Sequence, residues 1–159
     1  ELGFIKQAQS LTDQTLDYIL PRITAGRTER EVMLDMEFFM RSLGATGVSF
    51  DFIVVSGKNS SLPHGVPTDK KIEKGDFVTM DFGAKVNGYC SDMTRTVAIG
   101  EVSDMMADVY GIVLEAQEAA IAAQQAQQQA AQQAAQQAAQ QAAGGGQPPN
   151  DTEQITPNQ

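Results

Sequence analysis

An alanine and glutamine repeat near the end of the chain most strongly limits what this sequence can fold into. Residues 124–143 contain only these two residue types, in a pattern close to AAQQ. No Lys or Arg follows Arg95 and no aromatic residue follows Tyr110, so the last part of the 159-residue chain has little with which to build a core. We therefore expect a packed domain over residues 1–123, a helix over 124–143 and a disordered tail over 144–159.

Two helices are predicted at the start of the chain. Apolar residues recur at spacings of about three and four through residues 1–20, which is the pattern of an amphipathic helix. Thr28 and Glu31 form a Thr-x-x-Glu capping box that marks the start of a second helix, which should run to about Leu43. Ser103 is a suitable N-cap for a third helix that leads into the repeat.

Strands are predicted between the second and third helices. Residues 50–55 have the pattern of a short strand, and residues 76–84 and 88–99 are rich in strand formers. The pair Asn87-Gly88 between these two runs is a strong signal for a hairpin turn. The segment before the hairpin is a long loop rich in Gly and Pro, and such loops usually carry function. The predicted fold class is α+β, with helices packed on an antiparallel sheet.

The two strands of the predicted hairpin carry Asp81 and Asp92. If the turn is centred on Val86 and Asn87, the two aspartates lie directly opposite each other. If it is centred on Asn87 and Gly88, they are diagonal by one step. Because side chains alternate along a strand, both registers place the carboxylates on one face, away from the apolar face. Like charges at that separation destabilise a sheet, and a divalent cation between them would relieve the repulsion.

Each of these residues also has a simpler interpretation. Asp81 and Asp92 could lie on a solvated sheet face, where water screens their charges. His64, the only histidine, lies in the long loop between Pro63 and Gly65, and a lone histidine is more often a surface or hydrogen-bonded loop residue than a catalytic one. Spacing alone leaves both interpretations open.

Composition excludes several classes of function. The net charge is −9 and no basic cluster is present, which argues against a nucleic-acid partner because phosphate binding needs clustered positive charge. A single cysteine, Cys90, excludes an internal disulfide framework. No signal-peptide pattern and no long apolar run is found, so we expect a cytoplasmic protein with no membrane partner.

Several segments, taken together and in order, resemble one known family. The segments are Ser49-Phe50-Asp51, Ser56-Gly57-Lys58-Asn59-Ser60, Leu62-Pro63-His64-Gly65-Val66-Pro67-Thr68, Lys74-Gly75-Asp76, Met80-Asp81-Phe82-Gly83 and Tyr89-Cys90-Ser91-Asp92-Met93-Thr94-Arg95-Thr96. They closely resemble the Xaa-Pro aminopeptidase and Xaa-Pro dipeptidase branch of the methionine aminopeptidase/creatinase superfamily.

The resemblance implies the first half of a pita-bread fold, in which two α-β halves enclose two divalent metal ions, commonly Mn, Co, Zn or Fe. It also implies roles for single residues. Asp81 would bind one metal and Asp92 would bridge both, while the loop histidine, His64, would donate a hydrogen bond near the substrate or the tetrahedral intermediate. The implied substrate is a peptide with proline in second position, and residues that bind the rest of the substrate are not identified.

The family pattern further requires a metal-binding histidine and two metal-binding glutamates, whereas this sequence has one histidine and only Glu153 beyond Glu118. Three of the five implied ligands are therefore missing. We expect a truncated Xaa-Pro peptidase that is inactive alone. One alternative is a non-catalytic peptide-binding or scaffold module derived from the same fold. Another is self-association of two copies through the face that the second half would cover.

Overall fold

The computed structural model describes residues 1–144, and side chains up to residue 140. It divides into one compact unit over Glu1–Ala107 and a second that begins at Asp108. The first unit has helices packed on antiparallel strands, as the predicted α+β class requires. The prediction of disorder for 144–159 falls outside the described residues except for Gly144.

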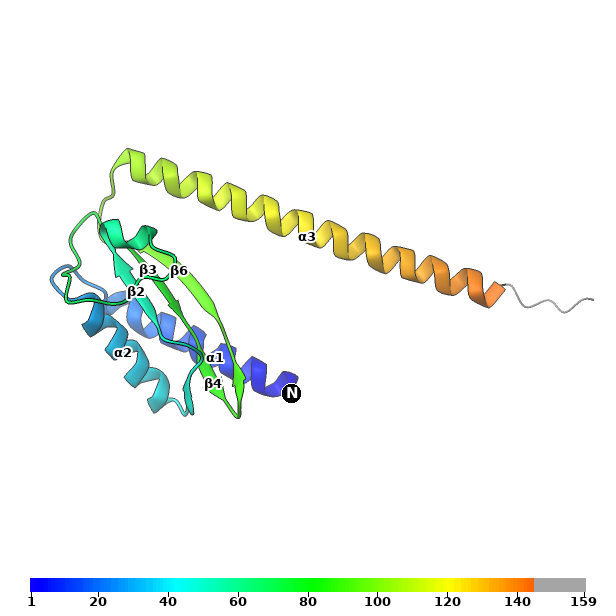
Figure 1. The fold of residues 1–159 in the computed structure, drawn as a ribbon, viewed down its shortest axis with the longest axis horizontal. Coiled ribbons are helices and arrows are strands. Elements are labelled where there is room, and N and C mark those ends of the chain that lie inside the picture. The colour runs from blue at the N-terminus through cyan, green and yellow to red at the C-terminus, as the bar shows by residue number, and fades with distance from the viewer. Residues whose placement is uncertain (145–159) are drawn as a thin grey trace, which may run out of the picture. The chain divides into compact units, whose positions relative to one another are not determined.

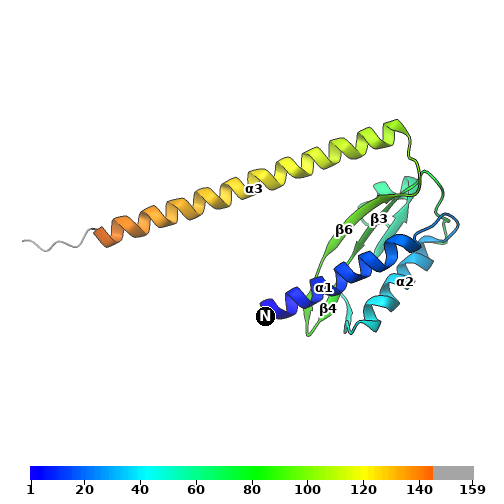
Figure 2. The same cartoon turned by 180° about the vertical axis from the view of Figure 1, so that it is seen from behind.

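The first two helices form where the sequence predicts them. Helix α1 spans Leu2–Ile19 and is followed by a 3-10 turn, η1, over Leu20–Arg22. Helix α2 spans Glu29–Ser42 and begins at the predicted capping box, in which the Glu31 amide donates to Thr28 Oγ1 at 3.1 Å and Glu31 Oε2 accepts from the Thr28 amide at 2.8 Å. Figures 1 and 2 show both helices on the same side of the strands.

Six strands form two three-stranded antiparallel sheets, in the orders β2-β3-β6 and β1-β4-β5. Their bounds are β1 Gly47–Val48, β2 Ile53–Ser56, β3 Phe77–Phe82, β4 Ala84–Val86, β5 Tyr89–Cys90 and β6 Met93–Ala98. The predicted hairpin is confirmed, because β3 pairs with β6 and β4 with β5.

The predicted strand over 50–55 is only partly right. Pairing starts at Ile53, because the segment before it crosses from one sheet to the other. At that crossing, the Ser49 amide donates to the Gly83 carbonyl at 2.9 Å and Phe52 turns into the core, where its ring packs edge-on against Phe82 at 5.9 Å. These contacts replace a regular ladder over the first residues of the segment.

The turn of the hairpin fixes its register. Asn87 and Gly88 have φ values of 50° and 85°, the left-handed pair that a two-residue turn of type I′ needs. Val86 accordingly pairs with Tyr89. The diagonal arrangement, one of the two predicted, is therefore correct, and Asp81 lies directly opposite Thr94.

The core lies between the two helices and one face of the strands. Most members of this cluster are buried apolar side chains that α1, α2 and the strands contribute, such as Ala8, Leu11, Ile19, Val32, Met36, Met40, Val54, Val78, Met80, Phe82 and Met93. Within the first unit, α1 and α2 both lie on the other side of the strands from the face of β3 and β6 that carries Asp81 (Figures 1 and 2). The predicted division of the hairpin into an apolar and a polar face is thus confirmed.

The long loop between β2 and β3 contains one short 3-10 turn, η2, over Gly57–Ser61. Its last part runs beside the start of α2, where Thr28 and Lys71 form an isolated antiparallel bridge.

Helix α3 spans Asp104–Gly144, so the predicted third helix continues through the repeat. The Met106 amide donates to the Ser103 hydroxyl at 3.4 Å, as expected for the N-cap. At about 1.5 Å per residue its 41 residues extend roughly 60 Å. Among the described helices, none is both long enough and apolar enough to cross a membrane.

Candidate metal centre

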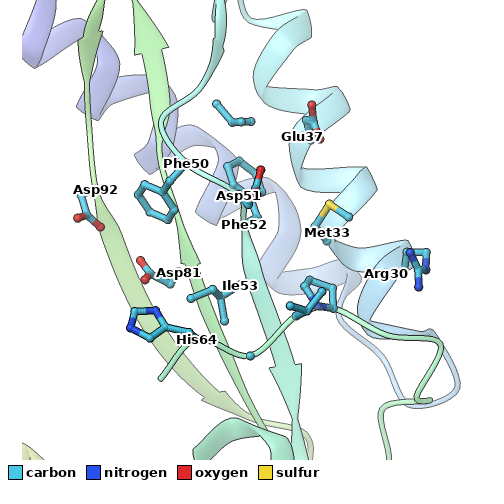
Figure 3. Close-up of a pocket in the computed structure, with 14 residues that line it drawn as sticks. Arg30, Met33, Glu37, Phe50, Asp51, Phe52, Ile53, His64, Asp81 and Asp92 are labelled. Atoms are coloured by element: carbon cyan, nitrogen blue, oxygen red, sulfur yellow. The ribbon is translucent and has the colours of Figure 1, made fainter. Parts of the chain in front are cut away.

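Asp81 and Asp92 come from neighbouring parts of the hairpin. Asp81 lies in the middle of β3 and is half-buried, whereas Asp92 lies between β5 and β6 and is exposed. Figure 3 shows both side chains on the same side of the hairpin. The carboxylate of Asp81 accepts a hydrogen bond from Thr94 Oγ1 at 3.0 Å. A fully solvated face, the simpler interpretation, therefore describes Asp92 but not Asp81.

The protonation of Asp81 responds to this setting. Burial raises the pKa of the Asp81 carboxyl above its ordinary value, because a charged group is less stable away from water. The hydrogen bond from Thr94 and the charge of His64 lower the pKa, while the charge of Asp92 raises it further. The net effect is a raised pKa for Asp81, so this carboxyl loses its proton less readily than an isolated aspartate.

His64 lies on the loop that passes in front of Asp81 (Figure 3). Its side chain is exposed, but the next residue, Gly65, is buried against β2. A Cβ at Gly65 would lie 2.7 Å from Val55 Cγ1, so the loop approaches the strand closely because this residue has no side chain. That close approach places the imidazole beside the two carboxylates.

The three predicted residues line one pocket of about 720 Å³. Its walls come from α2, from the crossing between β1 and β2, and from the loop. Most of the other lining residues are apolar, and the full set is Arg30, Met33, Glu37, Val48, Phe50, Asp51, Phe52, Ile53, His64, Gly65, Val66, Pro67, Asp81 and Asp92. The structure thus brings two carboxylates and one imidazole to the edge of a largely apolar pocket.

These residues fit part of a metal site. Two carboxylates with a raised pKa on one of them are a hard-oxygen donor set whose repulsion a divalent cation would relieve. Over residues 1–144, however, no group of three or more His, Cys, Asp or Glu side chains is close enough to hold a metal ion. The described residues therefore bring together two carboxylates that could bind a metal ion, without a third such side chain beside them.

Glu29 is the first residue of α2, and it is not among the predicted site residues. Its side chain is fully buried and accepts hydrogen bonds from Ser56 and Thr68, which flank the part of the long loop that carries His64. Acidic residues are common in the first turn of a helix, so the sequence held no signal for this second role.

Comparisons with known proteins agree with the resemblance. A model of metallopeptidase family M24 matches residues 3–152. The Xaa-Pro dipeptidase of Pyrococcus furiosus is 43% identical over 123 residues, which cover 77% of this chain and 35% of that protein. Among solved structures, an Xaa-Pro dipeptidase from Bacillus anthracis has a TM-score of 0.72 and 55% identity, covering 74% of this chain and 33% of the other.

An X-Pro aminopeptidase from Thermotoga maritima gives a TM-score of 0.71 and 48% identity, over 74% of this chain and 34% of the other. The chain thus spans about a third of the length of the relatives it matches. It belongs to metallopeptidase family M24 and contains part of the pita-bread fold.

Proposed function

We propose that this chain supplies part of the active site of a metal-dependent Xaa-Pro dipeptidase or aminopeptidase. The observation that carries the proposal is that Asp81, Asp92 and His64 lie together at one end of an apolar pocket. The relatives named above, an Xaa-Pro dipeptidase and an X-Pro aminopeptidase, share the fold over this region and support the substrate class.

Asp81 and Asp92 would hold the metal ions, and carboxylate oxygens suit Mn²⁺ as well as the Co, Zn or Fe that the family also uses. Divalent ions at such a site supply Lewis acidity, which activates water and polarises a peptide carbonyl. Thr94 fixes the orientation of the Asp81 carboxylate through its 3.0 Å hydrogen bond.

His64 would donate an imidazole N–H to the oxygen that gains negative charge as a peptide bond before proline is broken. The apolar walls of the pocket, among them Phe50, Ile53 and Val66, would orient the peptide and keep water from its side chain. No residue of the chain is assigned to the proline itself.

We further propose that the chain is inactive alone, since the described residues bring two carboxylates together and no third metal ligand. The cytoplasmic location also stays a proposal, which the exposed free thiol of Cys90 supports because such thiols persist in reducing compartments.

Metal binding can be tested without turnover. Mn²⁺ is paramagnetic and broadens NMR signals of nearby nuclei, and His64 is the only histidine, so its ring signals are unambiguous. We expect Mn²⁺ to broaden the His64 signals in the wild type and not in Asp81→Asn. Asp51→Asn is the matched control, because Asp51 lines the same pocket but does not lie on the hairpin. Equal broadening in all three proteins would contradict the assignment.

Hydrolysis of an Xaa-Pro dipeptide and of a longer Xaa-Pro peptide, with and without chelator, completes the test. We expect no turnover by the isolated chain. Chelator-sensitive turnover in a species that sediments as a dimer would instead support completion of the site by self-association. Peptide binding that needs no metal, in a chain that fails to bind Mn²⁺, would favour the non-catalytic module.

A further inference from the structure

Glu29 is the one fully buried carboxylate among the described residues of the first unit, and the proposed chemistry does not use it. One of its oxygens, Oε1, accepts hydrogen bonds from the Ser56 amide at 2.7 Å and the Ser56 hydroxyl at 3.0 Å. The other, Oε2, accepts from the Thr68 amide at 3.0 Å and the Thr68 hydroxyl at 2.7 Å. Asn59 Nδ2 adds a longer contact to Oε1 at 3.5 Å.

The two principal donors flank the His64 segment, residues 57–67 of the long loop between β2 and β3. Ser56 is the last residue of β2, and Thr68 follows the segment that lines the pocket. A single carboxylate therefore links the two residues that flank the His64 segment, because one of its oxygens binds Ser56 and the other binds Thr68. Hydrogen bonds to a charged acceptor are about twice as strong as those between neutral groups. This link is therefore stronger than the same number of hydrogen bonds between backbone groups.

The backbone at the start of α2 adds to the same closure. The amides of Glu29 and Arg30, which have no partner within the helix, donate to the Lys70 carbonyl at 3.1 Å and the Thr68 carbonyl at 3.0 Å. Lys70 Nζ in turn donates to Ser56 Oγ at 2.9 Å and forms a 2.8 Å ion pair with Asp76. Both ends of the His64 segment are thus bound to residues at the N-terminus of α2.

We propose that Glu29 is a positioning residue, whose buried carboxylate joins Ser56 to Thr68 and so holds His64 beside Asp81 and Asp92. The functional part of this inference rests on the proposed role of His64. Glu29 is not among the residues that line the pocket, so its carboxylate acts through the geometry of the loop. Burial would raise the pKa of Glu29, but the hydrogen bonds from Thr68 and Ser56 outweigh it and lower the pKa, which is consistent with a carboxylate that remains charged in this setting.

A purely structural role for Glu29 makes a different prediction, because it would weaken the whole fold and not the loop in particular. The full chain carrying Glu29→Gln distinguishes the positioning role from the purely structural role. Glutamine keeps the size of the side chain but turns one acceptor into a donor that faces the donors of Ser56 or Thr68. The matched control is Asp69→Asn, which removes an exposed carboxylate from the same loop, where it pairs with Arg30.

The measurements are amide hydrogen exchange and the NMR signals of the His64 ring. In Glu29→Gln we expect the Ser56 and Thr68 amides to exchange at least about tenfold faster, as loss of a hydrogen bond to a charged group implies. We expect the His64 ring signals to move toward those of a histidine in an unfolded peptide. The amides of Met80 and Phe82 in β3 should change less than about threefold, and Asp69→Asn should resemble the wild type in all of these.

A second pair of variants covers the case in which Glu29→Gln does not fold. Thr68→Val removes one hydroxyl donor at nearly constant shape, and Thr68→Ser restores it. We expect Thr68→Val to shift the His64 signals in the same direction as Glu29→Gln, and Thr68→Ser to return them to the wild-type positions.

Unchanged His64 signals in Glu29→Gln would overturn the proposal, as would acceleration of the β3 amides equal to that of the loop amides. If Glu29→Gln does not fold, His64 signals that are the same in Thr68→Val and Thr68→Ser would overturn it. None of these readouts needs metal or turnover. Absence of Mn²⁺ broadening in the wild type would therefore refute the proposed metal site while leaving the positioning of His64 intact.

Discussion

Gly83 offers the sharpest test of the hairpin geometry. A Cβ placed on this residue would lie 1.9 Å from the Ser91 carbonyl oxygen, 2.7 Å from the carbonyl carbon and 2.9 Å from Ser49 Oγ. The Ser91 carbonyl is backbone and cannot rotate away. Ser91 is itself held by its amide, which donates to the Ala84 carbonyl at 3.0 Å, and by its hydroxyl, which lies 2.7 Å from Thr12 Oγ1.

Gly83→Ala must therefore push the two strands apart by more than an ångström at this point. Inserting a methyl group into a packed core costs about 1–3 kcal/mol, and each buried hydrogen bond lost with it costs about 1 kcal/mol more. We expect the free energy of unfolding to fall by about 3–4 kcal/mol, which lowers the ratio of folded to unfolded protein by more than about a hundredfold. Because Asp92 directly follows Ser91, the same shift displaces that carboxylate.

Urea unfolding followed by tyrosine fluorescence measures this effect, since the chain has no tryptophan and Tyr18 and Tyr89 both lie in the first unit. Gly47→Ala is the matched control, because a Cβ there would meet only Lys85 Cδ at 4.0 Å. We expect the control to change stability by less than about 0.5 kcal/mol. A Gly83→Ala variant as stable as the control would refute the reasoning that the strands touch at this glycine.

Further predictions concern the pH dependence of stability, the buried hydroxyl of Thr12 and the helix-capping hydroxyl of Thr28. Burial alone would raise the pKa of Glu29, but the hydrogen bonds from Thr68 and Ser56 together outweigh it and lower the pKa below its ordinary value of 4.5. Glu29 therefore stabilises the fold above that pH, and this contribution to the free energy of unfolding is lost as the pH falls through the lowered pKa. The urea midpoint should consequently fall less steeply between neutral and acidic pH in Glu29→Gln than in the wild type. Thr12→Val, which leaves the buried Ser91 hydroxyl without this partner, should cost about 1–2 kcal/mol in urea unfolding, and Thr12→Ser should recover most of it. Thr28→Ala should cost about 1 kcal/mol by the same assay through loss of the helix cap, and no change would contradict the capping-box geometry.

The features that the sequence predicted correctly depend on residues close together in the chain. The capping box of Thr28 and Glu31 spans one helical turn, and the turn at Asn87-Gly88 belongs to a hairpin that places Asp81 and Asp92 on one face in either of the two predicted registers. Period-two alternation then separates the apolar face of the hairpin from the polar one.

The features that it missed depend on contacts between distant segments. Nothing near Glu29 in the sequence indicates that its carboxylate binds residues that lie beyond the next strand. The start of β2 was placed too early because the bond between Ser49 and Gly83 can only be known once the two sheets are arranged. Local sequence patterns predict the helices, the strands and the apolar face of each. The hydrogen bonds that hold a loop in place, and the points where two backbone segments touch, are known only from the tertiary structure.

The different origins of the site residues imply an order of assembly during folding. Asp81 and Asp92 share a hairpin whose turn is two residues long, and hairpins form within about 1–10 μs. His64 is instead held through contacts of Glu29 with Ser56 and Thr68, which are 27 and 39 residues away from Glu29 in the chain. Closing such long loops costs more entropy and takes place later. The carboxylate pair is thus set by a local event, while the imidazole joins it only when the helix and the loop have docked.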